Sequence, residues 1–91
     1  MASVVISYKI FPTAIEVDFK HLQRQIEKAL PSKAAIYADY QTEPIAFGLN
    51  ALIAHIKIPE DETGVLDEME QSIKEIPTVS QIQTIMVRRA R

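Results

Sequence analysis

Two short segments of this sequence carry residue types suited to holding another molecule. Phe47-Gly48 follows a Pro-containing turn, and the last four residues read Arg88-Arg89-Ala90-Arg91. A glycine can take a positive φ or allow a close backbone approach, and an aromatic ring beside it can anchor an interface. Arginine binds carboxylates and phosphates through paired hydrogen bonds. Each segment also has a purely structural interpretation. In the first, Phe47 is a core residue and Gly48 forms a bulge; in the second, the arginines are a basic tail that aids solubility.

Residues for catalysis or metal binding are scarce. The chain has no cysteine, which excludes disulfides, thiolate nucleophiles and Cys-type zinc sites. His21 and His55 have no second ligand at metal-site spacing, and Glu60-Asp61-Glu62 lacks a calcium-loop pattern. Pro12-Thr-Ala-Ile-Glu16 offers neither the glycine nor the arginine of a phosphate cradle, and no spacing indicates a nucleophile–base pair. We therefore expect a protein that is not an enzyme, with no cofactor and no metal.

Composition narrows the class of protein further. The chain has 91 residues, 47% of them hydrophobic, which predicts one globular domain over residues 1–91. Its 10 Lys and Arg against 12 Asp and Glu give a net charge of −2, so we expect neither a nucleic-acid partner nor an anionic membrane surface. No apolar run is long enough to span a bilayer, and the start has no signal-peptide pattern. These features predict a cytoplasmic protein.

Hydrophobic periodicity defines the first two elements. Apolar side chains occupy every second position from Val4 to Ile10, which predicts a strand. Pro12 ends this strand because proline has no N–H to donate. Apolar residues then recur at helical spacing between Asp18, a suitable N-cap, and Pro31. This pattern predicts an amphipathic helix.

The remaining elements follow in the order strand, strand, helix, strand. Ala34–Tyr40 is interpreted as a strand that Thr42-Glu43-Pro44 breaks, and Leu49–Ile58 is the clearest strand of the chain. Leu66, Met69, Ile73 and Ile76 predict a helix from about Val65 to Ile76, and Val79–Val87 a final strand that the arginines follow.

A β-α-β-β-α-β order predicts the α+β ferredoxin-like split fold. Right-handed crossovers then give a four-stranded antiparallel sheet with both helices on one face and the other face bare. The RNA-binding version of this fold stacks bases on aromatic residues of its third strand. The outward positions here are Ile53, His55 and Lys57, so no stacking platform is predicted.

The run Glu43-Pro44-Ile45-Ala46-Phe47-Gly48-Leu49, followed by Ala51-Leu52, resembles the hallmark segment of the archaeal translation elongation factor 1-beta family. Val4–Pro12 is similar to the opening strand of that family, and Val79-Ser80 through Val87-Arg88-Arg89 to its closing strand. The similarity therefore extends over nearly the whole chain.

This resemblance implies a guanine nucleotide exchange factor with the ferredoxin-like fold that acts on the GTPase elongation factor 1-alpha. In the eukaryotic relatives an aromatic residue in the segment that matches Ala46-Phe47-Gly48 contacts the GTPase, and a Lys near the C-terminal end perturbs its Mg²⁺. Here no Lys follows Lys74. The resemblance thus implies that the partner is contacted by Ile45, Phe47 and Gly48. It also implies that the phosphate or Mg²⁺ site of the GTPase is approached by Arg88, Arg89 and Arg91.

Two other classes of protein remain open from the residues. The first is a regulatory or oligomerisation module of the same fold that binds a small ligand, since an exposed Ile53 and an edge strand would allow dimerisation. The second is RNA binding through the bare face of the sheet. We expect a monomer if the protein is an exchange factor, whereas a dimer with a bound metabolite would favour the regulatory module.

Overall fold

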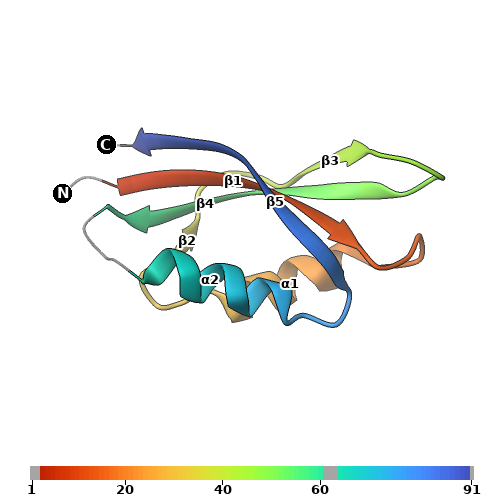
Figure 1. The fold of residues 1–91 in the computed structure, drawn as a ribbon, viewed down its shortest axis with the longest axis horizontal. Helices are drawn as coiled ribbons and strands as arrows, with labels where there is room; N and C mark the ends of the chain where they lie inside the picture. The colour runs from red at the N-terminus through yellow and green to blue at the C-terminus, as the bar shows by residue number, and fades with distance from the viewer. Residues whose placement is uncertain (1–2, 61–63, 91) are drawn as a thin grey trace.

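Five strands and two helices make up the fold in the computed structural model, which describes residues 3–60 and 64–90 (Figure 1). The elements are, in chain order, β1 (Ser3–Pro12), α1 (Phe19–Ala29), β2 (Ala35–Ile36), β3 (Gln41–Pro44), β4 (Asn50–Pro59), α2 (Val65–Lys74) and β5 (Val79–Ala90). The strands form an antiparallel sheet in the order β2-β4-β1-β5, and β3 also pairs with β4. Both helices lie on one face of this sheet, as the α+β ferredoxin-like prediction requires.

The prediction of four strands was wrong, because the predicted strand Ala34–Tyr40 is shorter and a fifth strand forms after it. Only Ala35–Ile36 of that segment pairs with β4, and the pairing resumes at Gln41–Pro44, where a break was expected. Pro44 is compatible with a strand here because β3 lies at the edge of the sheet, where a missing N–H removes no inner hydrogen bond.

The core lies between the sheet and the helices. Tyr8, Ile10, Leu52 and Ile56 from the sheet, and Leu22, Ile26, Met69 and Ile73 from the helices, are fully buried. The alternating face predicted for the first strand is therefore confirmed. In α2 the buried residue of the first turn is Val65 and not Leu66, which is 37% exposed. The buried face follows a spacing of four residues through Val65, Met69 and Ile73, so the predicted face was displaced by one residue at its start.

Local signals set the ends of both helices. Asp18 Oδ1 accepts the Lys20 backbone N–H at 3.0 Å, so Asp18 is the N-cap of α1 as predicted. The helix ends at Ala29, two residues before Pro31. Asp67 and Glu68 occupy the first turn of α2, where carboxylates interact favourably with the helix dipole.

The face of the sheet opposite the helices is more closely packed than the sequence suggested. Ile53 was predicted to be exposed, yet only 6% of its surface remains accessible. The reason is that β4 is an inner strand, with β1 on one side and β2 and β3 on the other. Ile53 pairs with Lys9 of β1 and with Gln41 of β3, so the side chains of both neighbours cover it.

β5 is longer than predicted and irregular. It pairs with β1 from Val79 to Ala90 and thus includes Arg88 and Arg89, which were expected to follow the strand as a tail. Ser7 is opposite Met86 and Tyr8 is opposite Thr84, so Ile85 is an extra residue without a partner on β1. This is a β-bulge, which bends the strand and increases its twist.

Tyr8 connects the sheet to α2 through a buried hydroxyl. Its Oη donates to Glu70 Oε2 at 2.8 Å. Burial, followed by the hydrogen bond to Glu70 and the charge of that carboxylate, raises the pKa of Tyr8 well above its ordinary value of 10.0. Burial and Glu27 raise the pKa of Tyr40 in the same direction.

Stability is therefore expected to fall in alkaline solution. Above about pH 10 the unfolded chain ionises Tyr8 while the folded protein keeps it neutral, so the unfolded state binds fewer protons. The free energy of unfolding then decreases by about 1.4 kcal/mol per pH unit for this residue alone. Urea unfolding at several pH values between about pH 9 and pH 11 measures this slope of the free energy of unfolding against pH. Tyr8→Phe should make it shallower, and an equally steep slope in that variant would contradict the assignment to Tyr8.

Candidate partner-binding surfaces

The β3–β4 hairpin presents Phe47 at its tip. The Ile45 N–H donates to the Leu49 carbonyl at 2.9 Å, and the Leu49 N–H donates to the Ala46 carbonyl at 3.0 Å. These two hydrogen bonds close a tight turn around Phe47 and Gly48, whose φ angles are 56° and 78°. Positive φ at both central residues is the requirement of a type I′ turn, which matches the twist of the flanking strands.

Phe47 is 93% exposed, which excludes the interpretation as a core residue. Gly48 is a turn residue with positive φ and not a bulge within the strand, while Ile45 is half-buried at the base of the loop. A phenylalanine with positive φ is strained by about 1–3 kcal/mol. The hairpin therefore holds a large apolar side chain in solvent at a cost to stability, which is a property expected of a binding residue.

Ile15, a residue that our sequence interpretation did not single out, lies at the same end of the molecule. It belongs to the loop between β1 and α1 and is 66% exposed. A β-carbon built on Gly48 would lie 3.7 Å from Ile15 Cδ1, so the isoleucine side chain lies beside the hairpin tip. One feature of the sequence could have identified Ile15: it is a large aliphatic residue in a loop between Pro12 and the N-cap of a helix, where polar residues are usual.

The arginines at the other end of the chain do not form one cluster. Arg88 is opposite Val5 and Arg89 is opposite Val4, so the alternation of the strand directs them to different faces of the sheet. The Arg88 guanidinium lies 5.9 Å from the centre of the Tyr37 ring, whereas Arg89 forms an ion pair with Glu60. Arg91 lies outside the described residues.

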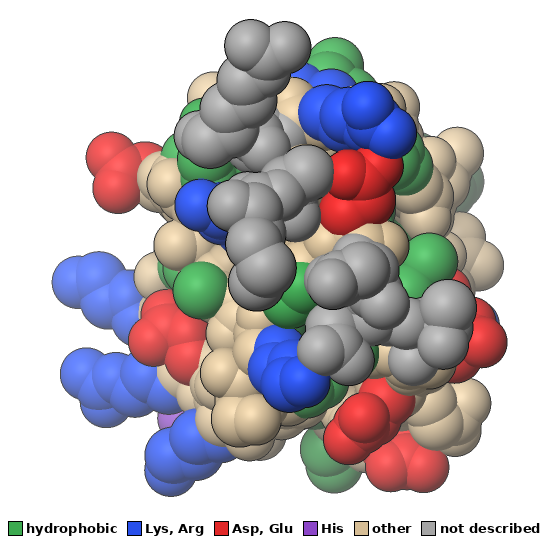
Figure 2. Space-filling view, turned by 90° about the vertical axis from the view of Figure 1, so that its left-hand side faces the viewer, with side chains coloured by type: hydrophobic (Ala, Val, Ile, Leu, Met, Phe, Trp, Pro, Cys, Tyr) green, Lys and Arg blue, Asp and Glu red, His purple; other side chains and the backbone are tan. Residues whose placement is uncertain are grey.

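The two predicted contact sets are at opposite ends of an elongated molecule. Its principal extents are 42 × 20 × 18 Å, and Figure 1 places the β3–β4 hairpin at one end of the long axis and the end of β5 at the other. Ile45, Phe47 and Gly48 therefore belong to one surface, and Arg88 and Arg89 to another. Figure 2, which views the end where β1 begins and β5 ends, shows charged side chains of both signs beside hydrophobic ones.

A serine and a histidine meet on the face of the sheet away from the helices, although no spacing indicated such a pair. Ser7 Oγ lies 2.7 Å from His55 Nδ1, and His55 Nε2 lies 3.4 Å from Gln41 Oε1. The third group is thus a neutral amide, which does not stabilise an imidazolium as the carboxylate of a catalytic triad does. The contact satisfies the buried hydroxyl of Ser7, and this explains it as structure.

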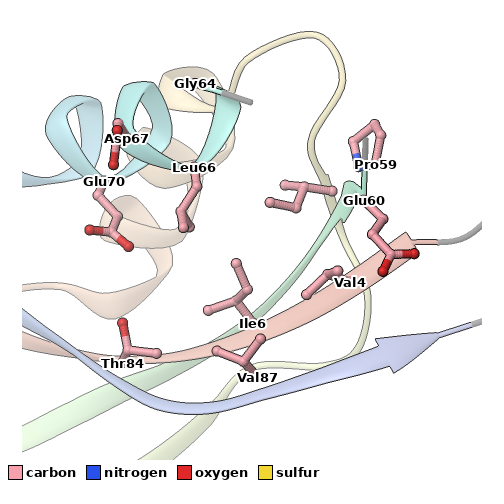
Figure 3. A pocket seen from close by; sticks show the side chains of 11 residues that line it. Val4, Ile6, Pro59, Glu60, Gly64, Leu66, Asp67, Glu70, Thr84 and Val87 are labelled. Atoms are coloured by element: carbon pink, nitrogen blue, oxygen red, sulfur yellow. The ribbon is translucent and has the colours of Figure 1, made fainter. Parts of the chain in front are cut away.

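A groove of about 380 Å³ lies between the start of α2 and the sheet, at the end that also holds the arginines. Figure 3 shows Leu66 and Glu70 pointing from α2 toward Thr84 and Val87 of β5. Its walls are mainly apolar, and its charged lining residues are the carboxylates Glu60, Asp67 and Glu70. Carboxylates repel phosphate, so this groove does not suit a nucleotide.

Within the described residues, no group of three or more histidine, aspartate or glutamate side chains is arranged to hold a metal ion. Asp61 and Glu62 of the acidic turn predicted before α2 lie outside those residues. In the same part of the chain no helix has the length and apolar character needed to cross a membrane.

The chain is thus an α+β ferredoxin-like domain with an exposed aromatic residue at the tip of one hairpin. The chain matches the family described as the EF-1 guanine nucleotide exchange domain over residues 5–90. Elongation factor 1-beta of Staphylothermus marinus is 38% identical over 89 residues, covering 98% of each chain. Elongation factor 1-beta of Saccharolobus solfataricus is 37% identical, covering 98% of this chain and 97% of the relative. The chain belongs to this family, and its role is nucleotide exchange in translation elongation.

A solved structure supports the fold independently. The C-terminal domain of the MgtC protein from Mycobacterium tuberculosis has a TM-score of 0.59 to this chain at 12% identity. The match covers 97% of this chain and 87% of the other. At this identity the likeness concerns the fold alone, because one fold hosts many functions. The family match, in contrast, favours the exchange factor over the regulatory module.

Proposed function

We propose that this protein accelerates the release of GDP from elongation factor 1-alpha by binding and stabilising the nucleotide-free GTPase. The observation that carries this proposal is the strained, 93% exposed Phe47 at the tip of the hairpin, within the segment that resembles the family's hallmark. A solvent-exposed phenylalanine with positive φ contributes no packing to its own fold. Its ring becomes buried only when a partner covers it.

Such a function requires binding energy and no catalytic side chain. A nucleotide held with nanomolar affinity is bound by about 12 kcal/mol. A thousandfold faster release lowers the barrier by about 4 kcal/mol, which a protein interface can supply. Because the coupling is reciprocal, the amount by which the factor weakens GDP binding equals the amount by which GDP weakens binding of the factor. A cofactor has no role in this scheme.

The placement of the candidate residues suggests that the two ends of the molecule have different roles in the contact with the GTPase. In our proposal Ile45, Phe47 and Gly48 provide affinity through an apolar contact at the hairpin end. Arg88 and Arg89 act at the other end, where a guanidinium can bind a phosphate or the acidic residues around Mg²⁺. We propose the same chemical role for Arg91. A partner that uses both sets must extend along the long axis of 42 Å.

We further propose that residues 1–91 act as one exchange domain, as a monomer in the cytoplasm, without direct contact with nucleic acid or membrane. The net charge of −2 supports this, because nucleic-acid binding is driven mainly by the release of counterions from phosphates that basic residues neutralise.

The decisive experiment follows the release of a fluorescent GDP analogue from elongation factor 1-alpha of the same organism, in excess unlabelled nucleotide. We expect the release rate to rise with the concentration of this protein and to reach a plateau about a thousandfold above the intrinsic rate. A rate that stays at the intrinsic value with an active GTPase would contradict the proposal. Size-exclusion chromatography with light scattering tests the monomer.

A further inference from the structure

Two loops that are far apart in the sequence form a single apolar end of the molecule. Phe47 and Ile15 are the two most exposed large hydrophobic residues in the part of the chain that the structure describes. Phe47 is at the tip of the β3–β4 hairpin, and Ile15 lies beside Gly48, with 3.7 Å between Cδ1 and a β-carbon built on that glycine. We call Ile15, Phe47 and the backbone of Gly48 the apolar tip.

The loop that carries Ile15 is fixed in place by backbone hydrogen bonds. The Thr13 N–H donates to the Thr78 carbonyl at 3.0 Å, which ties the start of the loop to the segment between α2 and β5. The Val17 N–H donates to the Ala14 carbonyl at 3.4 Å and closes a turn around Ile15. Ile15 is therefore held in an ordered turn with most of its side chain in water.

We propose that Ile15 is a partner-contact residue and that the apolar tip enters one hydrophobic depression on elongation factor 1-alpha. This inference rests on the proposed function. The tip projects from the end of the molecule and has no charged member, so its complement is concave and apolar. The exposed Glu16 and Asp18 follow Ile15 in the chain and supply the polar rim typical of an interface.

The test measures GDP release at increasing concentrations of Ile15→Ala. Because Ile15 is exposed, the variant keeps the wild-type fold, which circular dichroism and thermal unfolding verify. We expect the half-maximal concentration to rise about tenfold, with the maximal rate unchanged. Ile15→Leu should remain close to wild type. Ile85→Ala, the same substitution at an exposed position of β5, is the matched control and should have no effect.

A double variant then tests whether Ile15 and Phe47 share one contact. Residues in the same pocket affect each other, so the loss in Ile15→Ala/Phe47→Ala should differ from the product of the single losses by at least about threefold. If the loss in the double variant equals the product of the two single losses within error, the two residues make separate contacts and the proposal of a single apolar tip is wrong. If Ile15→Ala keeps the wild-type half-maximal concentration while Phe47→Ala is impaired, the inference about Ile15 is wrong and the proposed function still stands. A wild-type protein without effect on GDP release would instead overturn both.

Discussion

Replacing Phe47 with asparagine is expected to make this protein more stable and a much weaker exchange factor. The stability gain comes from the turn, where Phe47 has a φ of 56°. Asparagine tolerates positive φ better than phenylalanine, and a ring that is 93% exposed leaves no packing to lose. We expect the free energy of unfolding to rise by about 1 kcal/mol, which raises Tm by about 4–8 °C in a domain of this size.

The functional loss in the same variant has a separate cause. A central aromatic anchor contributes at least about 2 kcal/mol to an interface, so the half-maximal concentration for GDP release should rise about thirtyfold or more. Phe47→Leu keeps an apolar side chain and should lose less, and Leu66→Ala controls for removal of an exposed leucine on α2. An asparagine variant that is less stable than wild type would contradict strain at Phe47. An asparagine variant with full activity would contradict the anchor.

The arginines at the end of β5 are expected to affect the maximal rate of release. Arg88→Gln/Arg89→Gln removes two guanidinium groups that our proposal directs toward the phosphate or Mg²⁺ site. Hydrogen bonds to charged groups contribute about 1.5–3 kcal/mol, so the maximal rate of GDP release should fall by about tenfold to a hundredfold. Since the apolar tip is intact in this variant, its half-maximal concentration should change much less.

Two control variants sharpen this prediction. Arg24→Gln removes an exposed arginine of α1 and should leave the maximal rate unchanged. Glu60→Gln removes the ion-pair partner of Arg89 and should change stability little, because an exposed pair of this kind is weak. If the double arginine variant releases GDP at the wild-type maximal rate, the proposed role of these residues is wrong.

The general fold could be predicted because its signals are local and agree with one another. Alternation from Val4 to Ile10 determines β1, and the Asp18 cap and Pro31 delimit α1, all without long-range contacts. The division of 34–44 into β2 and β3 could not be predicted in this way. Both strands are short and exist because β4 offers them an edge, so their pairing depends on tertiary structure.

The candidate site was predicted in part. Phe47-Gly48 was singled out by composition, but whether Phe47 was buried or exposed depended on the length and type of the hairpin turn. Ile15 was missed because its significance comes from its proximity to Gly48, a contact between loops that are far apart in the sequence. The arginines were interpreted as a tail because two adjacent cations carry no β signal. Pairing with β1 places them in a strand and separates their side chains.

The bulge at Ile85 has a consequence for solubility. β5 pairs with β1 on one side, and among the described strands none covers its other edge. Ile85, Met86 and Val87 form an exposed apolar run on this strand, and such a run on a free edge is a template for intermolecular pairing and aggregation. The extra residue bends the edge away from the regular geometry that a second chain would need, and Arg88 and Arg89 follow immediately as charged gatekeepers. We therefore expect the guanidinium groups that we assign to the GTPase contact to oppose edge-to-edge pairing of the free protein as well.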